Sequence, residues 1–174
     1  MLSSLLHVNF ADTKPFVPQI TLAKVIKVYD GDTITVAAPI HDVIYRFSIR
    51  LLNVDAPEIR SKHDFEKRRA IEVRDNLHAL LFHKFVCVKI TDNDKYGGRY
   101  LGYVWSISDG MCINKYLLEN KFAVVYDGRT KCQWSEAMCQ GDFSNLKQNP
   151  VCEFPDLPKL DGDDAQVAVA LNNK

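Results

Sequence analysis

The chain has 174 residues, of which 47% are hydrophobic and 25% charged, proportions that suit one globular domain around a single core. Lysine and arginine balance aspartate and glutamate at 22 each, which argues against the overall positive field of many nucleic-acid-binding proteins. The balance is uneven along the chain. Residues 132–174 carry three lysines against seven acids, a net charge of −4, which leaves +4 for residues 1–131.

We expect no targeting signal from this sequence. No stretch approaches the roughly 20 apolar residues of a membrane-spanning helix, and the N-terminus lacks the basic start and apolar run of a secretory signal. We therefore expect a soluble, intracellular protein with no membrane partner and no obligate protein partner. The five cysteines are odd in number and lack C-x-x-C spacing, so free thiols are expected rather than a zinc site.

The first predicted sheet element is a β-hairpin. Residues 21–29 and 34–36 are rich in β-branched side chains, and the run Asp-Gly-Asp-Thr at residues 30–33 separates them. An Asp-Gly pair is a turn signal, which accounts for the first two residues of that run. It does not account for Asp32, whose carboxylate is repelled by the one two residues earlier.

A second motif follows the strand predicted over residues 43–51. The apolar face of this strand has period two and holds Tyr45, Phe47, Ile49 and Leu51. The run Asp-Ala-Pro-Glu at residues 55–58 comes next, and its proline makes the loop stiff. Because Arg50 and Asp55 are an odd number of residues apart, a regular strand would send their side chains to opposite faces. They can share a site only if the strand twists or breaks near Asn53.

The other elements are predicted from periodicity and turn residues. They are an irregular arm over residues 1–19, a helix over 64–83 with Asp64 as its N-cap, strands over 85–90 and 100–107 around a glycine-rich turn, helices over 113–121 and 133–140, and a flexible acidic tail over 149–174. The domain itself is expected over residues 20–148. The order of elements predicts a mainly β fold with helices (α+β), an OB-like barrel of five strands with a helix between the third and fourth. Such a fold does not by itself establish a function.

Three motifs together resemble the staphylococcal nuclease (thermonuclease) family. They are Val-Tyr-Asp-Gly-Asp-Thr at residues 28–33, Arg-Leu-Leu-Asn-Val-Asp-Ala-Pro-Glu at residues 50–58 and Asp-Lys-Tyr-Gly-Gly-Arg at residues 94–99. They stand in the order and rough spacing of that family, and the likeness covers about residues 21–128. The resemblance implies an OB-fold nuclease that cleaves P–O5′ bonds in DNA and RNA and leaves 3′-phosphates.

The resemblance also implies roles for individual residues. Asp32 and Asp55 would supply carboxylates to a calcium ion, with magnesium or manganese as alternatives, and the main-chain carbonyl of Ala56 would be a further ligand. Glu58 would orient or deprotonate the attacking water. The remaining positions carried over are Arg50 and Arg99, which would grip the phosphate, and Lys95, Tyr96 and Tyr126, which would border the nucleotide.

The chemistry of these residue types agrees with those roles. Two carboxylates within about 4 Å of each other repel by on the order of 4 kcal/mol at an effective dielectric constant near 20, so a hard divalent cation would relieve the site. Two departures from the family pattern are the alanine at residue 56, where well-known members have threonine, and one additional glycine before Arg99. A carbonyl ligand is unaffected by the first change, whereas the second could shift the arginine.

Two other functions remain open on the sequence. A catalytically inactive scaffold of the same fold would bind nucleic acid or protein, but such scaffolds usually lack several of the acids and arginines that are present here. An OB-type single-strand binder would need exposed aromatic side chains for base stacking. Tyr45, Phe47 and Tyr103 are instead expected in the core, so this function ranks last.

Overall fold

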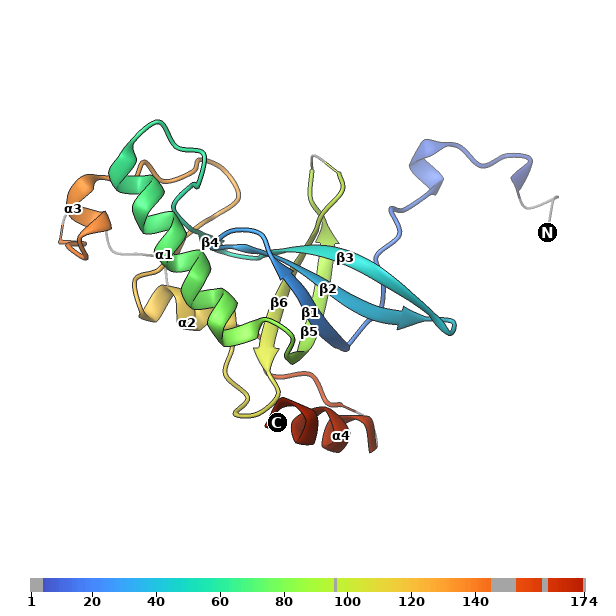
Figure 1. Cartoon of the computed structure of the whole chain (residues 1–174). Helices are drawn as coiled ribbons and strands as arrows, with labels where there is room; N and C mark the ends of the chain where they lie inside the picture. The colour runs from blue at the N-terminus through green and yellow to red at the C-terminus, as the bar shows by residue number, and fades with distance from the viewer. Residues whose placement is uncertain (1–4, 96, 145–152, 161–162, 174) are drawn as a thin grey trace.

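The computed structural model describes residues 5–95, 97–144, 153–160 and 163–173. Five strands close into a barrel in the order β1-β2-β3-β6-β5 (Figure 1). They are β1 (Leu22–Val28), β2 (Thr33–Ile40), β3 (Val43–Leu51), β5 (Phe85–Asn93) and β6 (Tyr100–Ser106). Parallel pairing of β3 with β6 closes the barrel, and every other pair of neighbours is antiparallel. The predicted five-stranded OB-like barrel is confirmed.

The core fills the inside of the barrel and extends to one helix. Its fully buried members include Val25, Ile34, Val36, Ile49, Val88 and Val104. Helix α1 (Asp64–Leu81) adds a buried stripe of Ala70, Val73, Leu77 and Leu81, spaced by three or four residues as one helix face requires. The predicted N-cap is wrong by one residue. His63 holds the extended cap position, and Asp64 is the first helical residue, where its charge favours the helix N-terminus.

The chain changes direction between β3 and the next short strand. Asn53 has a left-handed backbone with φ of +64°, a conformation that asparagine tolerates better than most residues. It separates β3 from β4 (Val54–Asp55), which pairs antiparallel with β7 (Val124–Val125). The break expected near Asn53 is therefore present.

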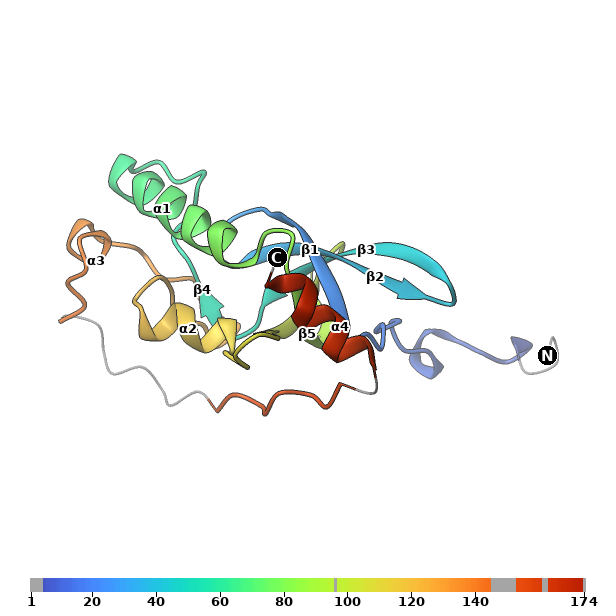
Figure 2. The same ribbon diagram turned by 60° about the horizontal axis from the view of Figure 1, so that its bottom comes forward.

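The described residues include three helices shorter than α1. They are α2 (Ile113–Glu119), α3 (Glu136–Cys139) and α4 (Asp163–Asn172). Helix α3 contacts α1, and α4 lies against β5, as Figure 2 shows. No helix within the described ranges is both long and apolar enough to cross a membrane.

Helix α4 corrects the expectation of a flexible tail over residues 149–174, part of which lies outside the described residues. The amide of Asn172 accepts a hydrogen bond from the main-chain N–H of Phe85 at 2.7 Å and donates one to its carbonyl at 2.8 Å. These two bonds attach the end of the helix to the start of β5.

Two segments extend away from the barrel (Figures 1 and 2). One is the N-terminal arm, which contains a 3-10 turn, η2 (Phe10–Asp12). The other is the end of the β2–β3 hairpin. Tyr45 lies on it and is 48% exposed, so its expected place in the core is wrong. Phe47 and Tyr103 are buried as expected.

Asn114 on α2 bonds to three main-chain groups. It is fully buried, accepts a hydrogen bond from the N–H of Val104, and donates to the carbonyls of Leu52 and Gly102. We expect Asn114→Ala to lower the free energy of unfolding by about 2 to 4 kcal/mol, because buried polar groups lose their partners. Urea denaturation measures the change. The matched control is Asn120→Ala at the exposed end of the same helix, which should cost less than about 1 kcal/mol; equal losses would contradict the role given to Asn114.

Candidate active site

The guanidinium of Arg50 lies between two buried carboxylates. Its Nη2 atom is 2.9 Å from Asp32 Oδ2 and 3.4 Å from Asp55 Oδ1, and its Nη1 atom donates to Asp32 Oδ1 at 3.1 Å. Only 4% of Asp32 and 2% of Asp55 are exposed. The guanidinium of Arg50 therefore connects Asp32, the residue before β2, to Asp55 in β4.

A close approach between two loops holds these acids in place. A Cβ atom at Gly31 would lie 2.7 Å from the Cβ of Ala56 and 2.8 Å from Cγ1 of Val73 on α1. Only glycine, which lacks a Cβ, permits such contact. The loop that carries Asp32 thus packs directly on the residue that follows Asp55.

The charges of the site are only partly balanced. Burial raises the pKa of Asp32 to about 7, the charge of Asp30 adds to this rise, and Arg50 opposes it. Burial also raises the pKa of Asp55, against a hydrogen bond from the main chain of Cys132 that lowers it. Burial alone would lower the pKa of Arg50, but the two acids outweigh it and raise the pKa. The guanidinium remains charged, yet one positive charge does not fully compensate its neighbours.

Glu58 stands on the loop that follows β4. Its main-chain N–H donates to Glu66 Oε1 at 3.0 Å, and Glu66 Oε2 accepts from the hydroxyl of Ser61 at 2.6 Å. Glu66 is buried in the first turn of α1. The helix therefore holds the loop through Glu66, a residue that sequence analysis did not single out, while the side chain of Glu58 stays half exposed.

Residues 126–135, which we call the strap, follow β7 and pass over the carboxylates. The N–H of Cys132 donates to Asp55 Oδ2 at 2.9 Å, and the ammonium of Lys131 pairs with Glu58 Oε1. Partial burial would lower the pKa of Lys131, but its hydrogen bond and attraction to Glu58 raise it overall. Two adjacent strap residues thus contact two acids predicted for the site.

The start of the strap is also fixed. The N–H of Tyr126 donates to the carbonyl of Asn53 at 3.0 Å. Its ring centroid lies 5.7 Å from the guanidinium carbon of Arg50, within the range of a cation–π contact. Tyr126, predicted to border a nucleotide, therefore packs on the arginine that joins the acids.

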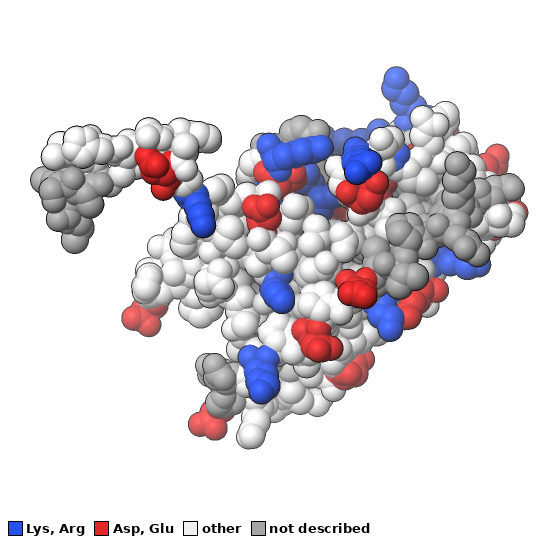
Figure 3. All heavy atoms as spheres, turned by 180° about the vertical axis from the view of Figure 1, so that it is seen from behind, with Lys and Arg blue, Asp and Glu red and all other residues white. Residues whose placement is uncertain are grey.

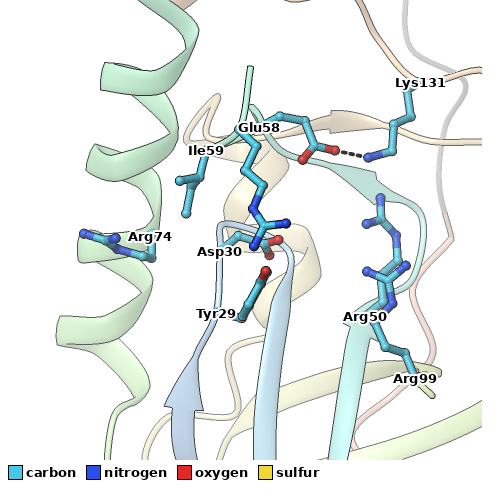
Figure 4. Close-up of a pocket in the computed structure, with 9 residues that line it drawn as sticks. Tyr29, Asp30, Arg50, Glu58, Ile59, Arg74, Arg99 and Lys131 are labelled. Carbon is cyan, nitrogen blue, oxygen red and sulfur yellow. Dashed lines mark hydrogen bonds and ion pairs between the residues drawn. The ribbon is translucent and has the colours of Figure 1, made fainter. Parts of the chain in front are cut away.

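A cavity of about 440 Å³ lies beside Arg50, Glu58 and Lys131 (Figure 4). It is lined by Tyr29, Asp30, Arg50, Glu58, Ile59, Arg60, Arg74, Arg99 and Lys131. Five of the nine residues are basic, although the whole chain is neutral. On the face seen in Figure 3, Lys and Arg side chains gather around a hollow at the upper edge, with acidic side chains between them. The cavity therefore suits an anionic ligand.

The structure brings most of the predicted site residues together. Arg50, Glu58 and Arg99 line the cavity, and Figure 4 shows the two arginines side by side. Arg99 is held by Asp94, with Nε and Nη2 at 2.9 and 2.5 Å from Asp94 Oδ2, so the additional glycine leaves it at the cavity.

Among the described residues, five predicted positions do not line the cavity. Asp32, Asp55 and Tyr126 contact Arg50 instead, and the other two are Ala56 and Lys95. Ala56 is buried behind the cavity, next to Gly31. Lys95 is exposed on the turn before Arg99, and Tyr96 lies outside the described residues. Their predicted contacts with cation or nucleotide stay predictions.

Sequence analysis missed three basic residues of the cavity: Arg60, Arg74 and Lys131. Lys131 is 73 residues away from its partner Glu58, in a segment without helical or strand periodicity, so no local pattern indicates the contact. Arg74 lies on α1, where arginine is common on a solvated face.

The donor atoms fit a hard divalent cation. Asp32 and Asp55 offer carboxylate oxygens, and burial, joined at Asp32 by the charge of Asp30, raises the pKa of both carboxyl groups, which a bound cation would offset. Among the described residues, no three His, Cys, Asp or Glu side chains are grouped to hold a metal ion. A cation beside this pair of acids would therefore complete its shell with main-chain carbonyls and water, as calcium and magnesium commonly do.

Replacement of Arg50, the positive charge between the two acids, should destabilise the fold. We expect Arg50→Met to lower the free energy of unfolding by about 3 to 5 kcal/mol at pH 8 with chelator present, because two buried carboxylates lose their counter-charge. Chemical denaturation measures the loss. Arg46→Met, on the exposed part of the same strand, is the control and should cost under about 1 kcal/mol. Adding Asp32→Asn to Arg50→Met should recover part of the stability; no recovery would contradict the charge argument.

Comparison with known families gives one match. A family model described as staphylococcal nuclease homologue matches residues 48–142, more than half of the chain. The matched range contains Arg50, Asp55, Glu58, Arg99 and Lys131, whereas Asp32 precedes it. A comparison with curated proteins gives no match.

Proposed function

Since this chain belongs to the family of staphylococcal nuclease homologues, we propose that it is a metal-dependent phosphodiesterase that hydrolyses DNA and RNA to 3′-phosphate products. The observation that carries the proposal is the meeting of Arg50, Arg99 and Glu58 at one cavity, beside a pair of buried carboxylates. Hydrolysis of a phosphodiester requires cationic groups for the phosphate and a base for water, and this cavity offers both.

The two arginines are the proposed phosphate ligands. A guanidinium remains charged at any working pH, and its forked donors match the equatorial oxygens on which negative charge grows during attack. Each arginine is already oriented by acids, Arg50 by Asp32 and Asp55 and Arg99 by Asp94. Their orientation therefore needs little adjustment when a phosphate arrives.

Glu58 is the proposed general base. In this scheme the water oxygen forms a bond to phosphorus, its proton passes to the carboxylate of Glu58, and the P–O5′ bond breaks on the opposite side. The O5′ oxygen then takes a proton from solvent. The bond between Glu66 and the main chain of Glu58 supports this role, because it fixes the loop while the carboxylate remains accessible.

Calcium is the proposed cation, with magnesium or manganese as alternatives. Asp32, Asp55 and the main-chain carbonyl of Ala56 would hold it. When bound, such an ion supplies a Lewis acid and a template for the phosphate. The support is the hard-oxygen donor set and the burial of the two carboxyl groups, which a cation would help to offset.

Loss of the proposed base should reduce turnover without unfolding the chain. We expect Glu58→Ala to lower kcat by roughly 10² to 10⁴, measured with single-stranded DNA and RNA in calcium, with the circular dichroism spectrum unchanged. Glu119→Ala, an exposed acid on α2, is the control. If the wild-type chain cuts neither substrate in calcium, magnesium or manganese, the interpretation as an inactive scaffold replaces the proposed nuclease function.

Calcium should raise the melting temperature. A hundredfold excess of ligand over its Kd adds about 2.7 kcal/mol to the free energy of unfolding, or roughly 5 to 10 °C for a chain of this size. Asp32→Asn should remove most of this shift, whereas Asp92→Asn, an exposed acid on β5, should preserve it. Equal shifts in the two variants would place the cation elsewhere.

A further inference from the structure

Lys131 has no role in the function proposed above. We propose that Lys131 is a substrate-binding residue, which pairs with Glu58 in the free protein and transfers to a phosphate of the nucleic acid when the substrate binds. This inference rests on the proposed nuclease function, because it takes the ligand of the cavity to be a polynucleotide. It adds a third cation to the two arginines.

The partners of the three cations differ in exposure, and this difference favours Lys131 for exchange. Arg50 pairs with two carboxylates that are almost fully buried, and Arg99 pairs with Asp94, which is 8% exposed. A buried acid that loses its cation is strongly destabilised. Those two arginines can therefore share a phosphate, but in the absence of a metal ion on the acids they stay paired with them.

The pair of Lys131 and Glu58 is different, because both side chains are half exposed. They are 50% and 46% exposed. Ion pairs between exposed side chains contribute little to stability, so exchange of the carboxylate for a phosphate meets little resistance. Figure 4 shows the two side chains facing each other across the upper side of the cavity that Arg50 and Arg99 also line.

The main chain of Lys131 is held although its ammonium is free to move. Cys132, the next residue, donates its N–H to Asp55, and Tyr126 bonds to Asn53 at the start of the strap. Trp134, three residues after Lys131, is buried. A four-carbon side chain on such a support reaches over the cavity with limited loss of backbone entropy.

The exchange would couple arrival of substrate to release of the base. While the ammonium is on Glu58 Oε1, it occupies one of the two oxygens that could accept a proton from water. A phosphate that attracts the ammonium leaves this carboxylate oxygen open for a proton. Lys131 would thus contact the substrate directly and act on Glu58 only through its departure.

Binding to an uncut probe tests the proposal. The probe is a fluorescein-labelled single-stranded DNA of twelve nucleotides, followed by anisotropy in calcium, and the parent is the full chain with Glu58→Gln. We expect Lys131→Met in this parent to raise Kd about tenfold and to reduce the salt slope of log K by about 0.7. Lys131→Arg should restore most of the affinity, since its charge remains.

The matched control is Lys115→Met, which removes a lysine of another exposed ion pair, with Glu119 on α2. It should change Kd less than about twofold. An unchanged Kd for Lys131→Met in the Glu58→Gln parent would overturn the proposal, because a lysine that merely orients Glu58 has no role once that carboxylate is gone.

Activity of the protein with Glu58 intact separates this inference from the proposed function. Wild-type cutting with no effect of Lys131→Met on Kd or KM overturns only the role of Lys131. A wild-type chain that neither cuts nor binds the probe overturns both.

Discussion

The sharing of Arg50 between Asp32 and Asp55 is the interaction on which the site depends. Strand pairing produces it. Arg50 is the register partner of Thr33 in the β2–β3 ladder, so its side chain emerges beside Asp32, and the pairing of β4 with β7 places Asp55 on the other side. A charged group with these neighbours cannot be removed without leaving acids buried and unpaired. The barrel and the site are therefore stabilised by the same contact.

The segments that complete the site come from distant parts of the chain. The β1–β2 loop brings Asp32, the loop after β4 brings Glu58, the β5–β6 turn brings Arg99, and the strap brings Lys131. The β1–β2 loop lies outside the range matched by the family model. Its Gly31 nevertheless packs on Ala56, which lies inside that range. Close packing thus joins the unmatched hairpin to the matched part of the domain.

Local patterns in the sequence were sufficient to predict the barrel, whereas the roles of the site residues came from the resemblance to a known family. Period-two alternation indicated β3, helical spacing indicated α1, and the odd spacing between Arg50 and Asp55 indicated the break that Asn53 makes. Tyr45 was placed wrongly because alternation gives the face of a strand but not how far its hairpin extends past the core. Neither a cap shifted by one residue nor a helix in an acidic, proline-containing tail has a local signal strong enough to detect.

The contacts of the strap could not be predicted from the sequence for a different reason. Lys131 meets Glu58 only because β7 pairs with β4 and directs the following loop across the cavity. That pairing involves two residues from each strand, too short a run for any periodicity. Long-range contacts made by irregular segments depend on the assembled fold, and so the sequence predicted the acids and arginines but not their lysine.

The left-handed turn at Asn53 restricts how this protein could vary in length. Adding or deleting one residue between Arg50 and Asp55 would rotate the carboxylate away from the guanidinium and break the main-chain bond to Tyr126. The β5–β6 turn is more permissive, since its two consecutive glycines have open space around them and Arg99 is still held by Asp94. Natural indels should thus gather at residues 94–99 and avoid residues 50–55.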